Sequence, residues 1–215
     1  MRYTSILFDL DGTLLDTLGD LTAAMNRTLT RHGLPERTRQ QMRAALGNGA
    51  RRLMELSVPD GTDGALFETL LAEYNADYAA HCRIETAPYP GVDALLRQLH
   101  AQGRKLAIVS NKPDEAVRAL RAEFFADTVP IAVGEKQGIR RKPAPDTLLA
   151  AMAQLGAERS STVYVGDSEV DIATARAAGL PCISVLWGFR DRDVLEQAGA
   201  QHFAADIAQL QALLG

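Results

Sequence analysis

The sequence predicts an α/β fold in which a doubly wound parallel sheet carries an inserted small α-helical domain. Three observations support this prediction. Short apolar runs recur along the chain and end in polar residues, helical patterns separate most of these runs, and one long interval after the first run contains helical patterns only. Strands that alternate with helices form parallel sheets through right-handed crossovers, and such sheets bind ligands at the carboxyl ends of their strands.

The apolar runs are the predicted strands. The first run covers residues 5–8 and ends in Asp9. Four further runs follow at residues 105–109, 129–133, 162–165 and 181–186. The run at 129–133 is the weakest strand candidate of the four. Continuous apolar runs of this length are typical of strands that helices cover on both faces.

Helical patterns lie between the later runs, at residues 92–100, 115–122, 146–155 and 169–178. Apolar side chains recur there at the spacing that places them on one face of a helix. Three of the patterns are followed by Gly103, Gly156 and Gly179. Glycine commonly ends helices, so these positions mark the predicted helix ends.

Residues 16–84, here called the cap segment, show no strand pattern. Leu18, Leu21, Met25 and Leu29 lie on one face of a predicted helix. The chain returns to the sheet near residues 88–91, whose Pro and Gly content suits a hinge. We therefore expect a helical cap domain at residues 16–84 and an α/β core domain formed by residues 1–15 and 85–215.

The composition excludes several classes of protein. The 215 residues are 47% hydrophobic and 23% charged, which is typical of a globular chain, and the net charge of −4 disfavours binding to nucleic acid or anionic lipid. Two cysteines without C-x-x-C spacing indicate neither a disulfide framework nor a zinc site. No signal-peptide core or membrane-spanning run is present, so we expect a cytoplasmic protein with a small-molecule partner, as a monomer or homodimer.

Polar clusters follow the predicted strands. The first, Asp9-Leu10-Asp11-Gly12-Thr13, places two acids at i and i+2 before a tight turn; standing alone, it could equally be an Asx-turn or a helix cap. Three others complete the set: Ser110-Asn111-Lys112, Lys142-Pro143-Ala144-Pro145 and Gly166-Asp167-Ser168-Glu169-Val170-Asp171. A doubly wound sheet would bring all four clusters to one rim.

These four clusters resemble the four motifs of the haloacid dehalogenase-like hydrolases, and the match spans nearly the whole chain. The helical cap and the Lys-Pro-x-Pro loop are most similar to the phosphoglycolate phosphatase branch. The resemblance implies a Rossmann-like core and a magnesium-dependent phosphatase that hydrolyses a small phosphomonoester through an aspartyl-phosphate. The first candidate substrate is 2-phosphoglycolate, with pyrophosphate, nucleoside monophosphates and sugar phosphates as alternatives.

The chemistry requires this combination of charges. A carboxylate about 4 Å from a phosphate charge is repelled by roughly 4 kcal/mol per charge pair at an effective dielectric near 20, so countercharges are needed. We expect Asp9 to attack phosphorus and Asp11 to act as acid and base. The resemblance implies that Mg²⁺ is held by Asp9, the backbone carbonyl of Asp11 and Asp167, with Asp171 beside these ligands. The expected phosphate and substrate contacts are Gly12, Thr13, Ser110, Asn111 and Lys142.

Two further polar segments have open interpretations. Gly47-Asn48-Gly49-Ala50-Arg51-Arg52, in the cap segment, is either a contact for an anionic substrate or an ordinary helix–helix turn with solvated arginines. The alternating charges of residues 190–193 indicate an exposed turn.

Two other functions share parts of this pattern. A phosphomutase would return the phosphoryl group to its substrate, and a receiver domain of a signalling protein also combines acids, a hydroxyl group and a lysine on a parallel sheet. The inserted helical segment and the length of the chain argue against the receiver domain.

Overall fold

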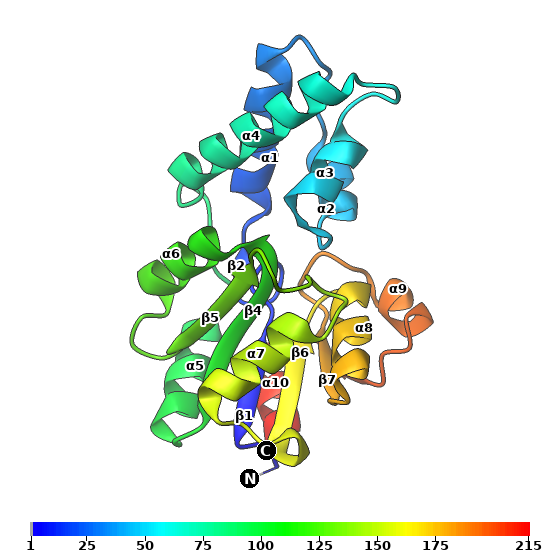
Figure 1. Ribbon diagram of the computed structural model, residues 1–215. Coiled ribbons are helices and arrows are strands. Elements are labelled where there is room, and N and C mark those ends of the chain that lie inside the picture. The colour runs from blue at the N-terminus through cyan, green and yellow to red at the C-terminus, as the bar shows by residue number, and fades with distance from the viewer. Residues whose placement is uncertain (1) are drawn as a thin grey trace.

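The computed structural model describes residues 2–215 and contains a six-stranded, wholly parallel sheet with the strand order β5-β4-β1-β6-β7-β8 (Figure 1). Its strands are β1 (Ser5–Phe8), β4 (Lys105–Pro113), β5 (Ile131–Glu135), β6 (Thr162–Gly166), β7 (Cys182–Val185) and β8 (His202–Ala204). The chain adds β4 and β5 on one side of β1 and then β6, β7 and β8 on the other. This order confirms the predicted doubly wound sheet and places its switch point beside β1.

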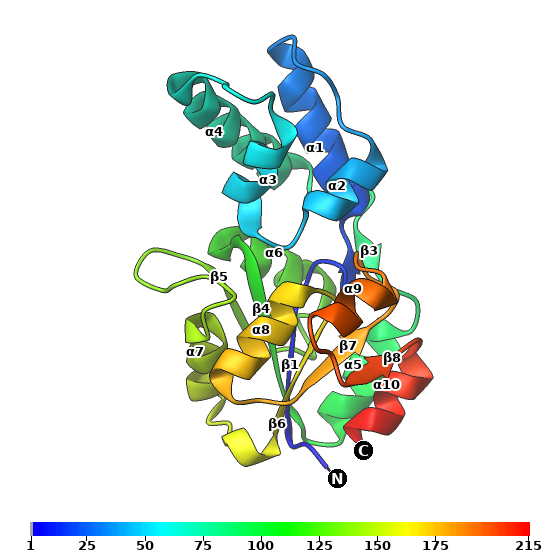
Figure 2. The same ribbon diagram turned by 90° about the vertical axis from the view of Figure 1, so that its right-hand side faces the viewer.

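Helices cover both faces of the sheet (Figure 2). One face packs against α5 (Val92–Ala101), α6 (Asp114–Phe124) and α10 (Ile207–Leu214), and the other against α7 (Asp146–Leu155) and α8 (Glu169–Ala178). Within β1, Ile6 and Phe8 belong to the first core and Leu7 to the second, so all three side chains are fully buried. This two-sided burial explains the uninterrupted apolar runs in the sequence.

The predicted elements of the sheet domain are all present, with small shifts at their ends. The helices expected at 146–155 and 169–178 have those bounds in the structure. Three elements near the carboxyl terminus were not predicted, namely α9 (Arg192–Gln197), β8 and α10, and a short 3-10 helix at Arg159–Ser161 was also missed. Strand β8 has three residues, two of them only half-buried, so it lacks the continuous apolar run that identifies the other strands.

The cap segment contains four helices, α1 (Leu18–Arg31), α2 (Arg39–Ala45), α3 (Gly49–Ser57) and α4 (Gly64–His81). They lie beyond the carboxyl ends of the strands, at the opposite end of the molecule from both termini (Figure 1). Met25 and Leu29 of α1 and Leu70 of α4 are fully buried between these helices. We retain residues 16–84 as the proposed cap domain. No helix within residues 2–215 has the length and apolar character needed to cross a lipid bilayer.

The two connections between sheet and cap segment lie side by side. Strand β2 (Leu15–Asp16) pairs antiparallel with β3 (Ala87–Pro88). Next to this pair, the buried carboxylate of Asp20 accepts hydrogen bonds of 2.9–3.0 Å from three consecutive backbone N–H groups, at residues 84–86. The start of α1 is thereby fixed to the returning chain.

Candidate active site

Asp9 stands directly after β1, at the carboxyl edge of the sheet and between its neighbours β4 and β6. Its side chain is buried, and Oδ1 accepts a hydrogen bond of 2.8 Å from the backbone N–H of Leu10 and pairs with Lys142 Nζ at 2.9 Å. Among the described residues, none donates a hydrogen bond to the other carboxylate oxygen, Oδ2. Asp9 therefore has one oxygen held in place and one free to react.

Asp171 organises the loop after β6. Its Oδ2 accepts 2.6 Å from Ser168 Oγ as well as hydrogen bonds from the backbone N–H groups of Asp167 and Ser168. Its Oδ1 contacts Lys142 Nζ at 2.8 Å and accepts 3.0 Å from Tyr164 OH. Both oxygens are occupied, so Asp171 is placed to orient the groups around it.

The side chain of Asp167 packs directly against the backbone of Gly12 and Gly188, where a larger residue would clash with it. A Cβ on Gly12 would lie 2.4 Å from Asp167 Oδ2, and a Cβ on Gly188 would lie 2.3 Å from Asp167 Cβ. Thr13 Oγ1 donates 3.1 Å to Oδ1, and the backbone N–H of Phe189 donates 2.7 Å to Oδ2. Gly12 and Thr13, expected to contact substrate, thus position the Asp167 carboxylate in this structure.

Asn111 holds the loop that carries Lys142. Its Oδ1 accepts 2.8 Å from the Lys142 backbone N–H, and its Nδ2 donates 3.0 Å to the Lys142 carbonyl and 3.0 Å to the Gly47 carbonyl. The side chain expected to bind substrate therefore binds backbone of the Lys142 loop and of the cap segment. Ser110, buried at the end of the apolar part of β4, lines the cavity described below.

The charges of the site are unbalanced. Carboxylate oxygens of Asp9, Asp167 and Asp171 lie within 4.8 Å of one another, and Lys142 is the cation among them. Burial and the neighbouring Asp171 raise the pKa of Asp9 and raise that of Asp167 to about 7. Burial also acts to raise the pKa of Asp171, but Lys142 outweighs it and the pKa is lowered. Three buried acids beside one lysine suit an additional cation.

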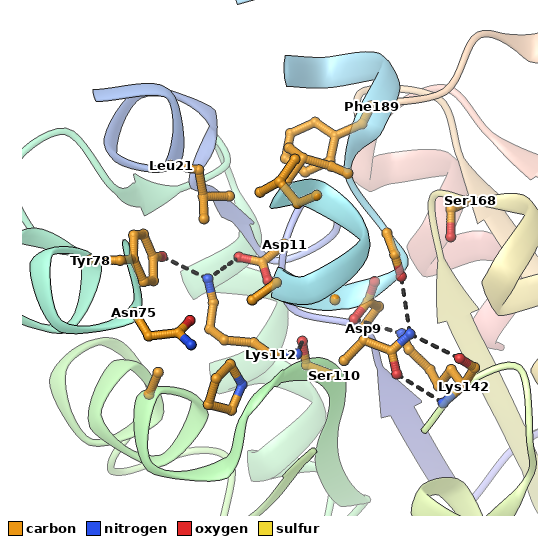
Figure 3. A pocket seen from close by; sticks show the side chains of 18 of the residues that line it. Asp9, Asp11, Leu21, Asn75, Tyr78, Ser110, Lys112, Lys142, Ser168 and Phe189 are labelled. Carbon is orange, nitrogen blue, oxygen red and sulfur yellow. Dashed lines mark hydrogen bonds and ion pairs between the residues drawn. The ribbon is translucent and has the colours of Figure 1, made fainter. Parts of the chain in front are cut away.

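A cavity of about 220 Å³ lies between this cluster and the cap segment (Figure 3). The core contributes polar groups to its wall, including Asp9, Asp11, Ser110 and Lys142. The cap segment contributes mainly apolar and aromatic groups, including Leu21, Leu53, Tyr74 and Tyr78, together with the amide of Asn75. The cavity is therefore bounded by reactive groups on one side and by shape-determining side chains on the other.

Lys112 connects the two walls. Its side chain is 4% exposed, and its ammonium group pairs with Asp11 Oδ1 at 2.8 Å and donates a hydrogen bond of 2.6 Å to Tyr78 OH (Figure 3). In the sequence, Lys112 belongs to the Ser110-Asn111-Lys112 motif without an expected role, and no pattern marks Tyr78. The one available signal was the position of Lys112 two residues after Ser110, at the same strand end.

The loop at residues 47–52 reaches the site only in part. Gly47 and Gly49 line the cavity, whereas Asn48 precedes α3 as its N-cap and is absent from the lining. Arg51 is exposed and pairs with Glu68 at 2.8 Å on α4. Arg52 is likewise exposed and pairs with Glu55 of its own helix. The structure brings the glycines to the cavity and places the arginine side chains outside its wall.

Arg190 corrects the interpretation of residues 190–193 as an exposed turn. Its side chain is 10% exposed, pairs with Glu169 at 2.8 Å and donates hydrogen bonds to the carbonyls of Arg43 and Leu46, at 3.0 and 2.6 Å. These carbonyls lie at the end of α2, where the helix dipole favours a cation. Arg190 therefore joins the loop after β7 to the cap segment.

Comparisons with known proteins identify the family of this chain. Residues 6–185 match the family model described as haloacid dehalogenase-like hydrolase. A phosphoglycolate phosphatase of Rhodospirillum rubrum is 35% identical over 98% of this chain and 90% of its own length. An N-acetylmuramic acid 6-phosphate phosphatase of Pseudomonas aeruginosa is 31% identical over 96% of this chain and 90% of its own length.

Solved structures give the same result. The crystal structure of a proposed phosphoglycolate phosphatase from Lactobacillus delbrueckii superimposes with a TM-score of 0.94 at 36% identity and covers 100% of this chain and 99% of its own. A predicted phosphoglycolate phosphatase from Haemophilus somnus gives a TM-score of 0.90 at 25% identity, covering 100% and 99%. The match to the family model, the relatives and the shared fold together show that this chain belongs to the haloacid dehalogenase-like hydrolases and is a phosphatase.

Proposed function

We propose that the chain is a magnesium-dependent phosphomonoesterase that forms an aspartyl-phosphate on Asp9, with 2-phosphoglycolate as its substrate. One observation carries the proposal: Asp9 is held through Oδ1, while Oδ2 has no donor among the described residues and Asp9 lines the cavity. A carboxylate in this state can attack phosphorus without first breaking its anchoring contacts.

The surrounding groups divide the remaining work. Lys142 offsets the repulsion between Asp9 and the phosphate and, with Ser110, binds phosphoryl oxygens. Asp11 protonates the departing ester oxygen and later takes a proton from the water that hydrolyses the aspartyl-phosphate. Its side chain is 20% exposed and lines the cavity, as this role requires.

The three buried carboxylates fit a magnesium ion, a cation that prefers oxygen ligands. Asp9, Asp167 and the backbone carbonyl of Asp11 would hold it, and Asp171 would orient the loop through its contacts with Ser168. When bound, the ion supplies positive charge that lowers the repulsion between carboxylate and phosphate.

The choice of substrate follows from relatives and from the size of the cavity. The phosphoglycolate phosphatase of Rhodospirillum rubrum covers almost the full chain, and a volume of about 220 Å³ suits a small ester. A sugar phosphate is the second candidate, since the relative from Pseudomonas aeruginosa acts on N-acetylmuramic acid 6-phosphate.

The test is phosphate release from a panel of 2-phosphoglycolate, pyrophosphate, nucleoside monophosphates and sugar phosphates. We expect selective turnover of 2-phosphoglycolate that EDTA removes and added Mg²⁺ restores. Asp9→Asn should abolish turnover, whereas Asp60→Asn, an exposed position of the cap segment, should retain it. Robust activity in Asp9→Asn would contradict the proposed nucleophile. Transfer of the phosphoryl group to a second hydroxyl group of the substrate, in place of release to water, would indicate a mutase.

A further inference from the structure

Lys112 has features of a ligand-binding group that the chemistry described above does not use. Its side chain is almost fully buried, yet it lines the cavity. An ammonium group has three N–H donors, and within residues 2–215 one of them donates a hydrogen bond, to Tyr78 OH. Asp11 Oδ1 pairs with the same ammonium group by charge at 2.8 Å, and the centroid of the Tyr78 ring lies 4.3 Å away. A buried cation that lines a cavity and whose donors are not all used by the protein is stabilised by a ligand that accepts from it.

The position of Lys112 along the cavity defines which part of a substrate it can meet. Figure 3 shows Asp9 and Lys142 on one side, Asp11 in the middle, and Lys112 and Tyr78 on the other. Phosphorus must lie at Asp9, and the ester oxygen must lie near Asp11 to receive its proton. The remainder of the leaving group therefore extends toward Lys112 and the aromatic wall of α4.

We propose that Lys112, positioned by Tyr78, binds a carboxylate on the carbon next to the ester oxygen, so that the enzyme selects phosphate esters of short 2-hydroxycarboxylic acids. This inference rests on the proposed function and explains its choice of substrate. The ammonium group lies 2.8 Å from Asp11 Oδ1, so the two groups that would touch carboxylate and ester oxygen are themselves in contact. In the phosphate ester of such an acid a single carbon separates the carboxylate from the ester oxygen, so the two ligand groups are as close together as the two protein groups that would contact them.

The charges of the cavity favour the same class of leaving group. Lys142 is already engaged by Asp9 and Asp171, and Arg190 by Glu169 and the end of α2. Lys112 is the cation whose position beyond Asp11 matches the leaving group. A neutral sugar or alcohol in this place could accept a hydrogen bond from Lys112 but would bring no negative charge, so a carboxylate gains the stronger, charge-assisted contact.

The test compares two substrates of nearly equal size that differ in charge, 2-phosphoglycolate and 2-hydroxyethyl phosphate. Wild-type enzyme should prefer the carboxylate by at least about tenfold in kcat/KM, and Lys112→Met should lower that preference by about 10- to 100-fold, the range for one hydrogen bond to a charged group. Lys105→Met is the matched control, because Lys105 is exposed at the opposite end of the same strand. Tyr78→Phe, which keeps the ring, should lower the preference by a smaller factor.

Two results would overturn the proposal in different ways. Equal losses on both substrates in Lys112→Met, in a variant that melts like wild type, would show that Lys112 only positions Asp11, and the proposed hydrolysis of 2-phosphoglycolate would stand. A wild-type preference for 2-hydroxyethyl phosphate would refute both the substrate and the carboxylate contact, while phosphatase activity lost in Asp9→Asn would remain. If Lys112→Met does not fold, the same comparison in Tyr78→Phe decides, and an unchanged preference there refutes the contact.

Discussion

Replacing Arg190 by Met tests whether the core holds the cap segment closed over the cavity. In the structure two hydrogen bonds cross from this guanidinium to the carbonyls of Arg43 and Leu46, at 3.0 and 2.6 Å. A hydrogen bond to a charged group contributes about 1.5–3 kcal/mol net of its exchange with water. Taking the lower value for each bond, the substitution removes about 3 kcal/mol from the closed arrangement, or about a hundredfold in the ratio of closed to open molecules.

Two assays measure this change. Amide hydrogen exchange without substrate should become faster in α2 and in the loop that follows it, because these backbone groups lose their contact with the core. In addition, kcat/KM should fall by up to about a hundredfold if the closed form is the reactive one. The exchange measurement separates closure from any direct contact between Arg190 and substrate, since no substrate is present.

Arg192→Met is the matched control for Arg190→Met. Arg192 pairs with Glu196 on its own helix at 2.7 Å, both side chains are more than half exposed, and the pair makes no bridge to the cap segment. Exposed pairs of this kind contribute little to stability. If the two variants show the same exchange in α2, the reasoning that Arg190 holds the cap segment is refuted.

Two further predictions concern the buried charges. Lys142→Met leaves Asp9 and Asp171 without their shared cation, so we expect activity to be lost and the free energy of unfolding at neutral pH to fall by about 3–5 kcal/mol, measured by denaturant titration; an unchanged midpoint would contradict this. Burial acts to raise the pKa of Asp77, but two arginines outweigh it and the pKa is lowered, so its stabilisation is present above the ordinary pKa of an aspartate and lost as pH falls further. Asp77→Asn should therefore be less stable than wild type at pH 7, and thermal melting should show this difference shrinking below about pH 4; a difference independent of pH would contradict it.

The sheet could be predicted from the sequence because its strands are buried on both faces. Burial of Ile6, Leu7 and Phe8 requires three apolar residues in succession, and such a run can be recognised in the sequence alone. Strand β8 at the edge of the sheet has no such requirement, and its His202 and Phe203 are only half-buried. Edge elements therefore lack the signal by which central strands are found.

The groups around the carboxylate cluster could be anticipated because they follow strands and share one rim. The partners across the cavity could not, since Tyr78 lies 34 residues from Lys112 and belongs to a helix on which it follows Tyr74 at ordinary core spacing. Arg190 was misjudged for a related reason. Alternating charges are typical of exposed turns, and only the approach of α2 shows that one of these side chains is buried.

The pairing of β2 with β3 makes the molecule modular. Leu15 and Asp16 lie opposite Pro88 and Ala87, so the chain leaves the sheet domain and comes back at adjacent points. Another helical insert with equally close ends could be grafted there without altering the strands, and a short turn could replace the insert altogether. Asp9 and the aromatic side chains of α4 that line the cavity are thus carried by separate stretches of sequence, so one wall of the cavity can be exchanged while the carboxylates of the other wall stay in place.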